Sequence, residues 1–177
     1  MDGVARAAQL PDTSPPGGSA MADTRPQPFD PGDDLRVRLT LLNAALATKV
    51  VHVRCYTRDA LCAAGPGSEA VKAAFGRNAR EAQGHALRLA ERIQQLGGRP
   101  DFHVGGLMSR GDTHDEEGRT LVELLRENLA AERAAIETYR DLLPYFAERD
   151  PDTQRLLEEL LTEEESHARA LQALLEP

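Results

Sequence analysis

The chain has 177 residues, of which 41% are apolar and only 4% aromatic, a composition that favours a single helical domain of ordinary size. Its net charge of −8 argues against DNA as a partner, because phosphate binding requires lysine and arginine to displace counterions. No apolar run approaches the roughly 20 residues that span a bilayer, so we expect a cytoplasmic protein without a membrane partner.

The N-terminal segment, residues 1–33, is crowded with proline, glycine, serine and aspartate and lacks the apolar stretch of a signal peptide. We expect a disordered tail here, followed by one folded domain over residues 34–177. The sequence leaves open whether Met21 is the true start. Cys55 and Cys62 are the only cysteines, and we expect both to be free thiols.

Four long segments with an alternating three–four spacing of apolar residues follow, which is typical of amphipathic helices. They cover about residues 35–63, 69–96, 119–149 and 151–175. Ser68 is the expected cap of the second helix, and Asp150 or Asp152 that of the fourth. Short links predict two antiparallel hairpins that bury their apolar faces against each other. The long connection over residues 101–117 allows the second and third helices to run parallel.

Polar or small residues interrupt each apolar face near its midpoint. They are Lys49, Ala82, His85, Glu132, Glu164 and His167. Because the midpoints of bundle helices lie at one level, we expect these residues to form one buried layer, in which a carboxylate needs a cation or a metal. Glu164 and His167 are three residues apart, so both can reach one metal from one helix face. The alternative is a solvated helix surface, but both residues fall on the apolar face.

The first half of the chain resembles the second. By this comparison Lys49 takes the position of Glu132, and Ala82 takes that of Glu164. One half therefore keeps two glutamates and a histidine, whereas the other keeps only His85.

Several further side chains have simpler interpretations. Tyr56 and Tyr139 each follow a polar midpoint residue by seven positions, and we expect their hydroxyls to bond carboxylates in the core. We expect Arg92 to reach solvent or an interface. The glutamate runs 158–159 and 163–165 are expected on a solvated face.

Five stretches of the chain carry a family resemblance. They are LLNAALATKVVHVRCY, HALRLAERIQQLGGRPDF, GGLMSRGDTH, ENLAAERAAIETYR and DPDTQRLLEELLTEEESHARAL. Over about residues 35–175 the chain resembles a bacterioferritin-related group of bacterial ferritin-like proteins, which overlaps with Dps-like proteins. The resemblance implies an all-α, ferritin-like antiparallel four-helix bundle with a long crossover after the second helix. It also implies a homo-oligomer, either a dimer or a hollow shell, and iron storage or detoxification.

The resemblance also implies a two-iron centre. Glu132 and His167 would hold one iron and His85 the other, and Glu164 would bridge them. The methionine that binds haem in true bacterioferritins falls at Gln83, so we expect no haem.

The chain departs from this pattern at two ligand positions, because the family's first-helix glutamate is Lys49 and its second-helix bridging glutamate is Ala82. We expect iron to bind poorly beside His85, so that each subunit holds one ion or none. Glu81 and His52 are candidates to replace a lost ligand, but both lie off the apolar face, and a histidine beside a core is more often a hydrogen-bonded helix residue.

Two functions remain open. The first is an iron-binding protein with a partly lost centre, whose ferroxidase activity the sequence does not decide. The second is a structural subunit in which Lys49 replaces a metal and pairs with Glu164, co-assembling with an active ferritin-like paralogue. A DNA-protecting role ranks third, because the charge is acidic.

Overall fold

The computed structural model describes residues 31–104 and 119–176, and within these ranges the chain is a bundle of four helices without strands. The helices are α1 (Pro31–Cys62), α2 (Ser68–Gln95), α3 (Leu121–Phe146) and α4 (Pro151–Leu175). The predicted all-α four-helix class is confirmed. The predicted tail lies outside the described residues up to position 30, and its last three residues belong to α1.

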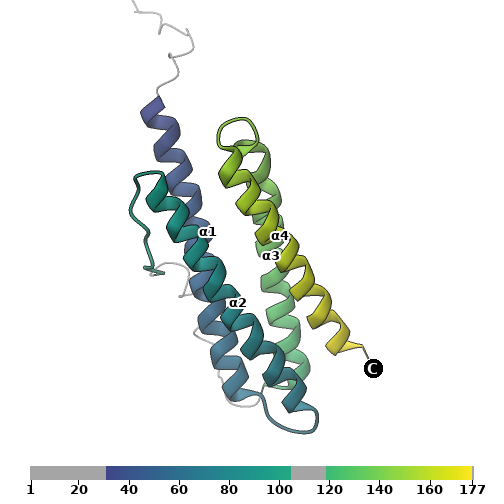
Figure 1. The fold of residues 1–177 in the computed structure, drawn as a ribbon. Coiled ribbons are helices and arrows are strands. Elements are labelled where there is room, and N and C mark those ends of the chain that lie inside the picture. The colour runs from purple at the N-terminus through teal and green to yellow at the C-terminus, as the bar shows by residue number, and fades with distance from the viewer. Residues whose placement is uncertain (1–30, 105–118, 177) are drawn as a thin grey trace, which may run out of the picture.

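Figure 1 shows two antiparallel hairpins, α1 with α2 and α3 with α4, packed side by side. Helices α2 and α3 point in the same direction, as the long connection between them allows. None of the helices in the described ranges combines the length and apolar character that a membrane span requires.

The helix starts follow local backbone chemistry. Gly67, with a left-handed φ of 82°, caps α2, and Ser68 is its first helical residue, so the predicted serine cap is wrong. Asp150 caps α4 by accepting a hydrogen bond from the Thr153 backbone N–H at 3.1 Å. At the start of α3, Thr120 forms a reciprocal capping box with the residue three positions on.

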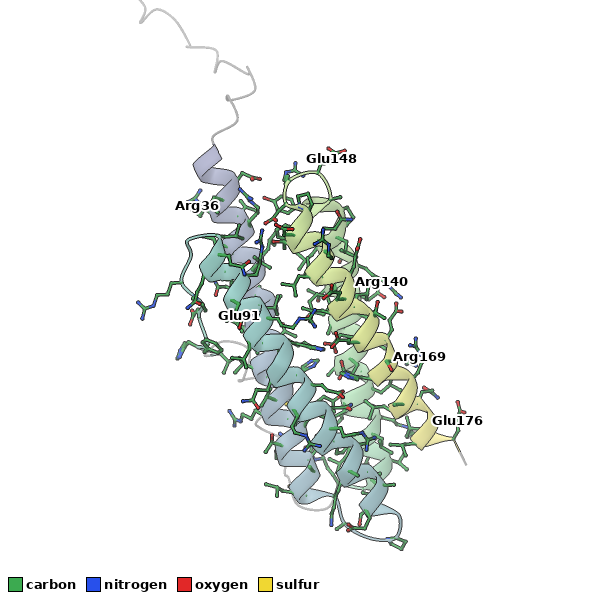
Figure 2. The ribbon with its side chains drawn as sticks, in the orientation of Figure 1. Arg36, Glu91, Arg140, Glu148, Arg169 and Glu176 are labelled. Carbon is green, nitrogen blue, oxygen red and sulfur yellow. The ribbon has the colours of Figure 1, made fainter. Side chains whose placement is uncertain are left out.

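Two apolar clusters fill the bundle on either side of its midpoint. One includes Leu42, Leu46, Leu89, Ile93, Phe146, Leu157 and Leu160, and the other includes Tyr56, Phe75, Leu124, Leu125 and Leu171. On α1 the first cluster ends near residue 46 and the second begins near residue 56, which leaves the polar midpoint between them. Figure 2 shows the labelled charged side chains, among them Glu91, Arg140 and Arg169, projecting from the outer surface. The midpoint layer is therefore enclosed by apolar packing at both ends.

Candidate metal centre

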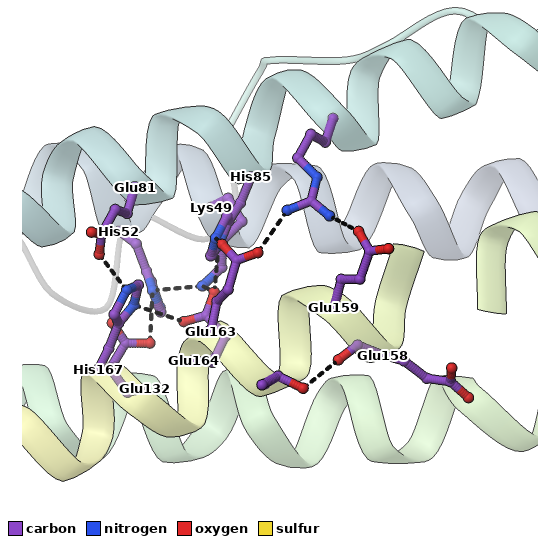
Figure 3. A network of polar contacts seen from close by, with 12 residues as sticks. Lys49, His52, Glu81, His85, Glu132, Glu158, Glu159, Glu163, Glu164 and His167 are labelled. Atoms are coloured by element: carbon purple, nitrogen blue, oxygen red, sulfur yellow. Dashed lines mark hydrogen bonds and ion pairs between the residues drawn. The ribbon is translucent and has the colours of Figure 1, made fainter. Parts of the chain in front are cut away.

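The structure brings the polar midpoint residues of all four helices into one buried layer (Figure 3). The exposed fractions are 1% for Lys49, Glu132 and Glu164, 2% for His85, 3% for Ala82 and 9% for His167. Charged groups are buried to this extent only when they are paired with an opposite charge or coordinate a metal. The alternative of a solvated helix surface does not hold for Glu164 and His167.

Lys49 lies at the centre of this layer. Its Nζ is 2.6 Å from Glu164 Oε1 and 3.1 Å from His52 Nδ1. The same Nζ lies 5.8 Å from the centre of the Tyr139 ring, within the range of a cation–π contact. The amino group of Lys49 therefore lies within the layer of carboxylates.

The two buried glutamates differ in their ionisation. Burial and the neighbouring Glu164 carboxylate raise the pKa of Glu132. Burial also opposes ionisation of Glu164, but the neighbouring imidazoles of His167 and His85 and the charge of Lys49 outweigh it, so its pKa is lowered. The layer therefore concentrates its negative charge on Glu164, the carboxylate that Lys49 contacts.

Each of these glutamates also has one carboxylate oxygen that is available to a ligand. Within the described ranges, Glu132 Oε2 and Glu164 Oε2 are buried and have no hydrogen-bond partner. Buried carboxylate oxygens without partners are uncommon, and a bound cation is one way in which proteins satisfy them.

The two tyrosines behave differently. The Tyr56 hydroxyl donates a short hydrogen bond to Glu132 Oε1, as expected. The Tyr139 hydroxyl is buried and has no hydrogen-bond partner in the described part of the chain, so the expectation of a carboxylate partner is wrong there. Burial raises the pKa of both hydroxyls, which keeps them protonated.

His85, on α2, is held by two carboxylates of α4. Its Nδ1 lies 2.8 Å from Glu164 Oε1, and its Nε2 lies 2.6 Å from Glu163 Oε2. Glu163 is therefore part of the layer's edge and not of a purely solvated face, which corrects the sequence interpretation. Arg88 supports it by donating to Glu163 Oε1 at 2.9 Å.

His167, on α4, has the complementary arrangement. Its Nδ1 lies 3.8 Å from Glu132 Oε1 and 3.8 Å from Glu164 Oε2, while its Nε2 pairs with Glu81 of α2. Burial disfavours the charged ring, but these three carboxylates outweigh it and raise the pKa of His167. The His85 and His167 rings stack with centroids 5.9 Å apart.

His52 is the residue that sequence analysis underestimated. It is buried, and its Nδ1 lies 3.8 Å from Glu132 Oε2. One potential ligand atom from each of His52, Glu132 and Glu164 falls within 4.8 Å of the others. Burial and the charge of Lys49 lower the pKa of His52 to about 3, so the ring is neutral at physiological pH. Its position three residues after Lys49, on the same helix face, was the available signal.

Arg92, which was expected to reach solvent or an interface, is partly buried and is held by contacts within the chain. Its Nε donates to Thr153 Oγ1 at 2.8 Å, and a terminal guanidinium nitrogen lies 2.5 Å from Asp150 Oδ1. With the pairs around His85 and His167, these contacts form a polar seam between α2 and α4.

The donor atoms of the layer are unevenly distributed. Ala82 offers no ligand atom, and Lys49 Nζ is at hydrogen-bond distance from Glu164 Oε1. The two unpartnered carboxylate oxygens lie near the imidazoles of His52 and His167, and carboxylate and imidazole groups are ligands that iron accepts.

Comparison with known proteins identifies the family. The family model described as a ferritin-like domain matches residues 39–177. The chain belongs to the ferritin-like family. This ferritin-like chain is 31% identical over 147 residues to the DNA protection during starvation protein of Pyrococcus furiosus, covering 81% of this chain and 80% of that protein.

Solved structures of other ferritin-like proteins agree with this assignment. The bacterioferritin-related protein of Bacteroides fragilis, described as a dodecameric thioferritin, matches with a TM-score of 0.71 at 28% identity, covering 80% of this chain and 85% of that one. A Dps homologue from Halobacterium salinarum gives 0.73 at 27% identity, with 81% and 82% covered. The predicted bacterioferritin-related and Dps-like relationship is confirmed.

Proposed function

We propose that this protein is a ferritin-like iron-binding protein for storage or detoxification, whose two-metal centre is reduced to a site for one ion per subunit. The observation that carries the proposal is the 2.6 Å contact between Lys49 Nζ and Glu164 Oε1, beside two carboxylate oxygens without partners. Lys49 supplies one positive charge, and the unpartnered oxygens are the donor atoms available to a single ion as substrate.

Charge supports a single ion. Relative to the family pattern, Lys49 and Ala82 remove two carboxylates and add an ammonium, which changes the local charge by about three units. Two divalent ions then lack the negative charge that would offset them. Among the family positions, Glu132, Glu164 and His167 remain as ligands of one ion.

We assign His85 a different role from the one that the resemblance implies. Both of its ring nitrogens are hydrogen-bonded to carboxylates, Glu164 on the inside and Glu163 on the outside. Its neighbour across the layer is Lys49, which contacts the same oxygen of Glu164. We therefore propose that His85 orients the Glu164 carboxylate and that no second ion binds beside His85.

The second candidate is a structural subunit without metal. Lys49 and His85 together already hold Glu164 Oε1, which is the observation that favours it. Such a subunit would co-assemble with an active paralogue. For the iron-binding candidate we propose a homo-oligomer, because the Bacteroides fragilis relative is described as dodecameric. The acidic net charge of −8 gives no support to DNA binding.

The test is an anaerobic titration of metal-free protein with ferrous iron, counting ions bound per subunit, followed by exposure to oxygen. We expect one ion per subunit and slow oxidation. Binding of two ions would contradict the reduced site. Binding of none would favour the structural candidate.

A double variant tests the assignment of the lost positions. Lys49→Glu with Ala82→Glu restores two carboxylates to the layer, so capacity should rise toward two ions. Lys72→Glu with Ala73→Glu adds the same charge on the outer side of α2 and should leave capacity unchanged. An equal rise in both variants would show that added surface charge, and not the layer, binds the metal.

A further inference from the structure

We propose that His52 is a ligand of the single metal ion, replacing the first-helix carboxylate that is absent at Lys49. The inference rests on the proposed one-ion site and adds a ligand outside the family positions. Helix α1 would then still contribute a ligand, but from a position three residues further along the chain.

The first argument is geometric. His52 Nδ1 lies 3.8 Å from Glu132 Oε2, which has no hydrogen-bond partner within the described ranges. A tetrahedral ion with bonds of about 2.0–2.2 Å places neighbouring ligand atoms about 3.3–3.6 Å apart. One atom each of His52, Glu132 and Glu164 lies within 4.8 Å of the others, so these atoms need to approach one another by no more than about 1.5 Å.

The second argument is the chemistry of the completed donor set. His167 Nδ1 lies 3.8 Å from Glu164 Oε2 and would supply a second imidazole. Two imidazole nitrogens and two carboxylate oxygens suit a first-row transition ion and not calcium or magnesium, which prefer oxygen alone. The neutral ring of His52 is the form that coordinates such an ion.

Lys49 limits how the ion is held. Its Nζ lies 3.1 Å from the same Nδ1 of His52 and 2.6 Å from Glu164 Oε1. An ion bound to His52 Nδ1 would replace the first of these hydrogen bonds, and Lys49 would keep its contact with Glu164 Oε1. Glu132 and Glu164 would then offer the ion their unpartnered Oε2 atoms.

The experiment titrates the full-length, metal-free protein with cobalt(II) against a competing chelator and records the visible absorption of the bound ion. His52→Gln should weaken binding by at least about tenfold, the lower end of the loss known even for outer-shell partners. His103→Gln removes an exposed histidine outside the layer and should leave affinity unchanged. Circular dichroism checks that each variant folds.

A second variant keeps the proposal testable if His52→Gln does not fold. His52→Cys should bind cobalt(II) and gain a thiolate-to-cobalt charge-transfer band that the wild type lacks. A folded, cobalt-binding His52→Cys protein without this band overturns the inference, as does unchanged affinity in His52→Gln. If the wild type binds no cobalt or ferrous ion, the proposed function fails first, and the inference fails with it.

Discussion

Lys49 and Glu164 form an ion pair across the middle of the bundle, with Nζ and Oε1 2.6 Å apart and each side chain 1% exposed. The pair joins α1 to α4, so it links the two hairpins at the level where apolar packing is interrupted. Water cannot replace either partner there. The stability of the metal-free protein therefore depends on keeping both charges together.

Replacing Lys49 with methionine keeps an unbranched side chain that is one atom shorter, but it leaves Glu164 without its cation. We expect the free energy of unfolding of the metal-free protein to fall by about 3–5 kcal/mol, as when one partner of a buried pair is removed. Added zinc or ferrous ion should then stabilise the variant more than the wild type, because the competing charge is gone. Urea denaturation with and without metal measures both effects.

The matched control is Lys72→Met. Lys72 is 38% exposed and pairs with Glu69 at 3.1 Å on the surface of α2, so its loss should cost less than about 1 kcal/mol. Equal destabilisation by the two substitutions would mean that the buried pair contributes no more than a solvated one.

The two core tyrosines offer a second matched comparison. Tyr56→Phe removes the donor to Glu132 and should cost about 1–3 kcal/mol, because a buried carboxyl loses a hydrogen bond. Tyr139→Phe removes a hydroxyl without a partner in the described ranges, so stability should stay the same or rise. Thermal unfolding of both variants checks this, and a larger loss for Tyr139→Phe would show that its hydroxyl has a partner.

The fold could be predicted because it rests on local signals. Apolar spacing gave the four helices, and the turn residues between them gave the two hairpins. The polar layer could be predicted as well, since bundle midpoints lie at one level whichever way each helix runs. The Gly67 cap was missed because Ser68 is the commoner capping type and the sequence does not display backbone angles.

The edge of the site could not be predicted in the same way. Periodicity indicates which face of a helix is buried, but it does not say which residue of another helix lies opposite. Glu163 and Arg92 looked solvated for this reason, although their partners are His85 and Asp150 on the facing helix. His52 lies beside the apolar face, and only the position of Lys49 and Glu132 shows that it points into the layer.

The α2–α4 seam predicts a pH dependence. Burial opposes ionisation of Asp150, but hydrogen bonds from Thr153 and the charge of Arg92 outweigh it and lower its pKa. The folded pKa thus lies below the unfolded value of about 3.9. The stabilisation is present above that value and is lost as pH falls through the folded pKa.

Asp150→Asn isolates this effect, because asparagine still caps the helix but carries no charge. The wild type should be more stable than the variant at pH 6, and the difference should shrink as pH is lowered from 5 toward 2. Denaturant unfolding across this range measures it. A difference that grows on acidification would contradict the sign of the shift.

The last comparison concerns the two glutamates that bond the outer nitrogens of the stacked histidines. Glu81 of α2 holds His167 of α4, and Glu163 of α4 holds His85 of α2, each through the outer ring nitrogen. Glu81 and Glu163 each lie four residues before the histidine of their own helix, so the two pairs are related by exchanging α2 and α4.

If His167 binds the metal and His85 does not, the two glutamates should differ in their effect on metal affinity. Glu81→Gln should lower the affinity for ferrous iron or cobalt(II) by about 10–100-fold, because it loosens the ring of a ligand. Glu163→Gln should change affinity little, since His85 then orients Glu164 and contacts no ion. A chelator-competition titration measures both constants. Comparable losses in the two variants would show that His85 also coordinates, and a second ion would then have to be considered beside Lys49.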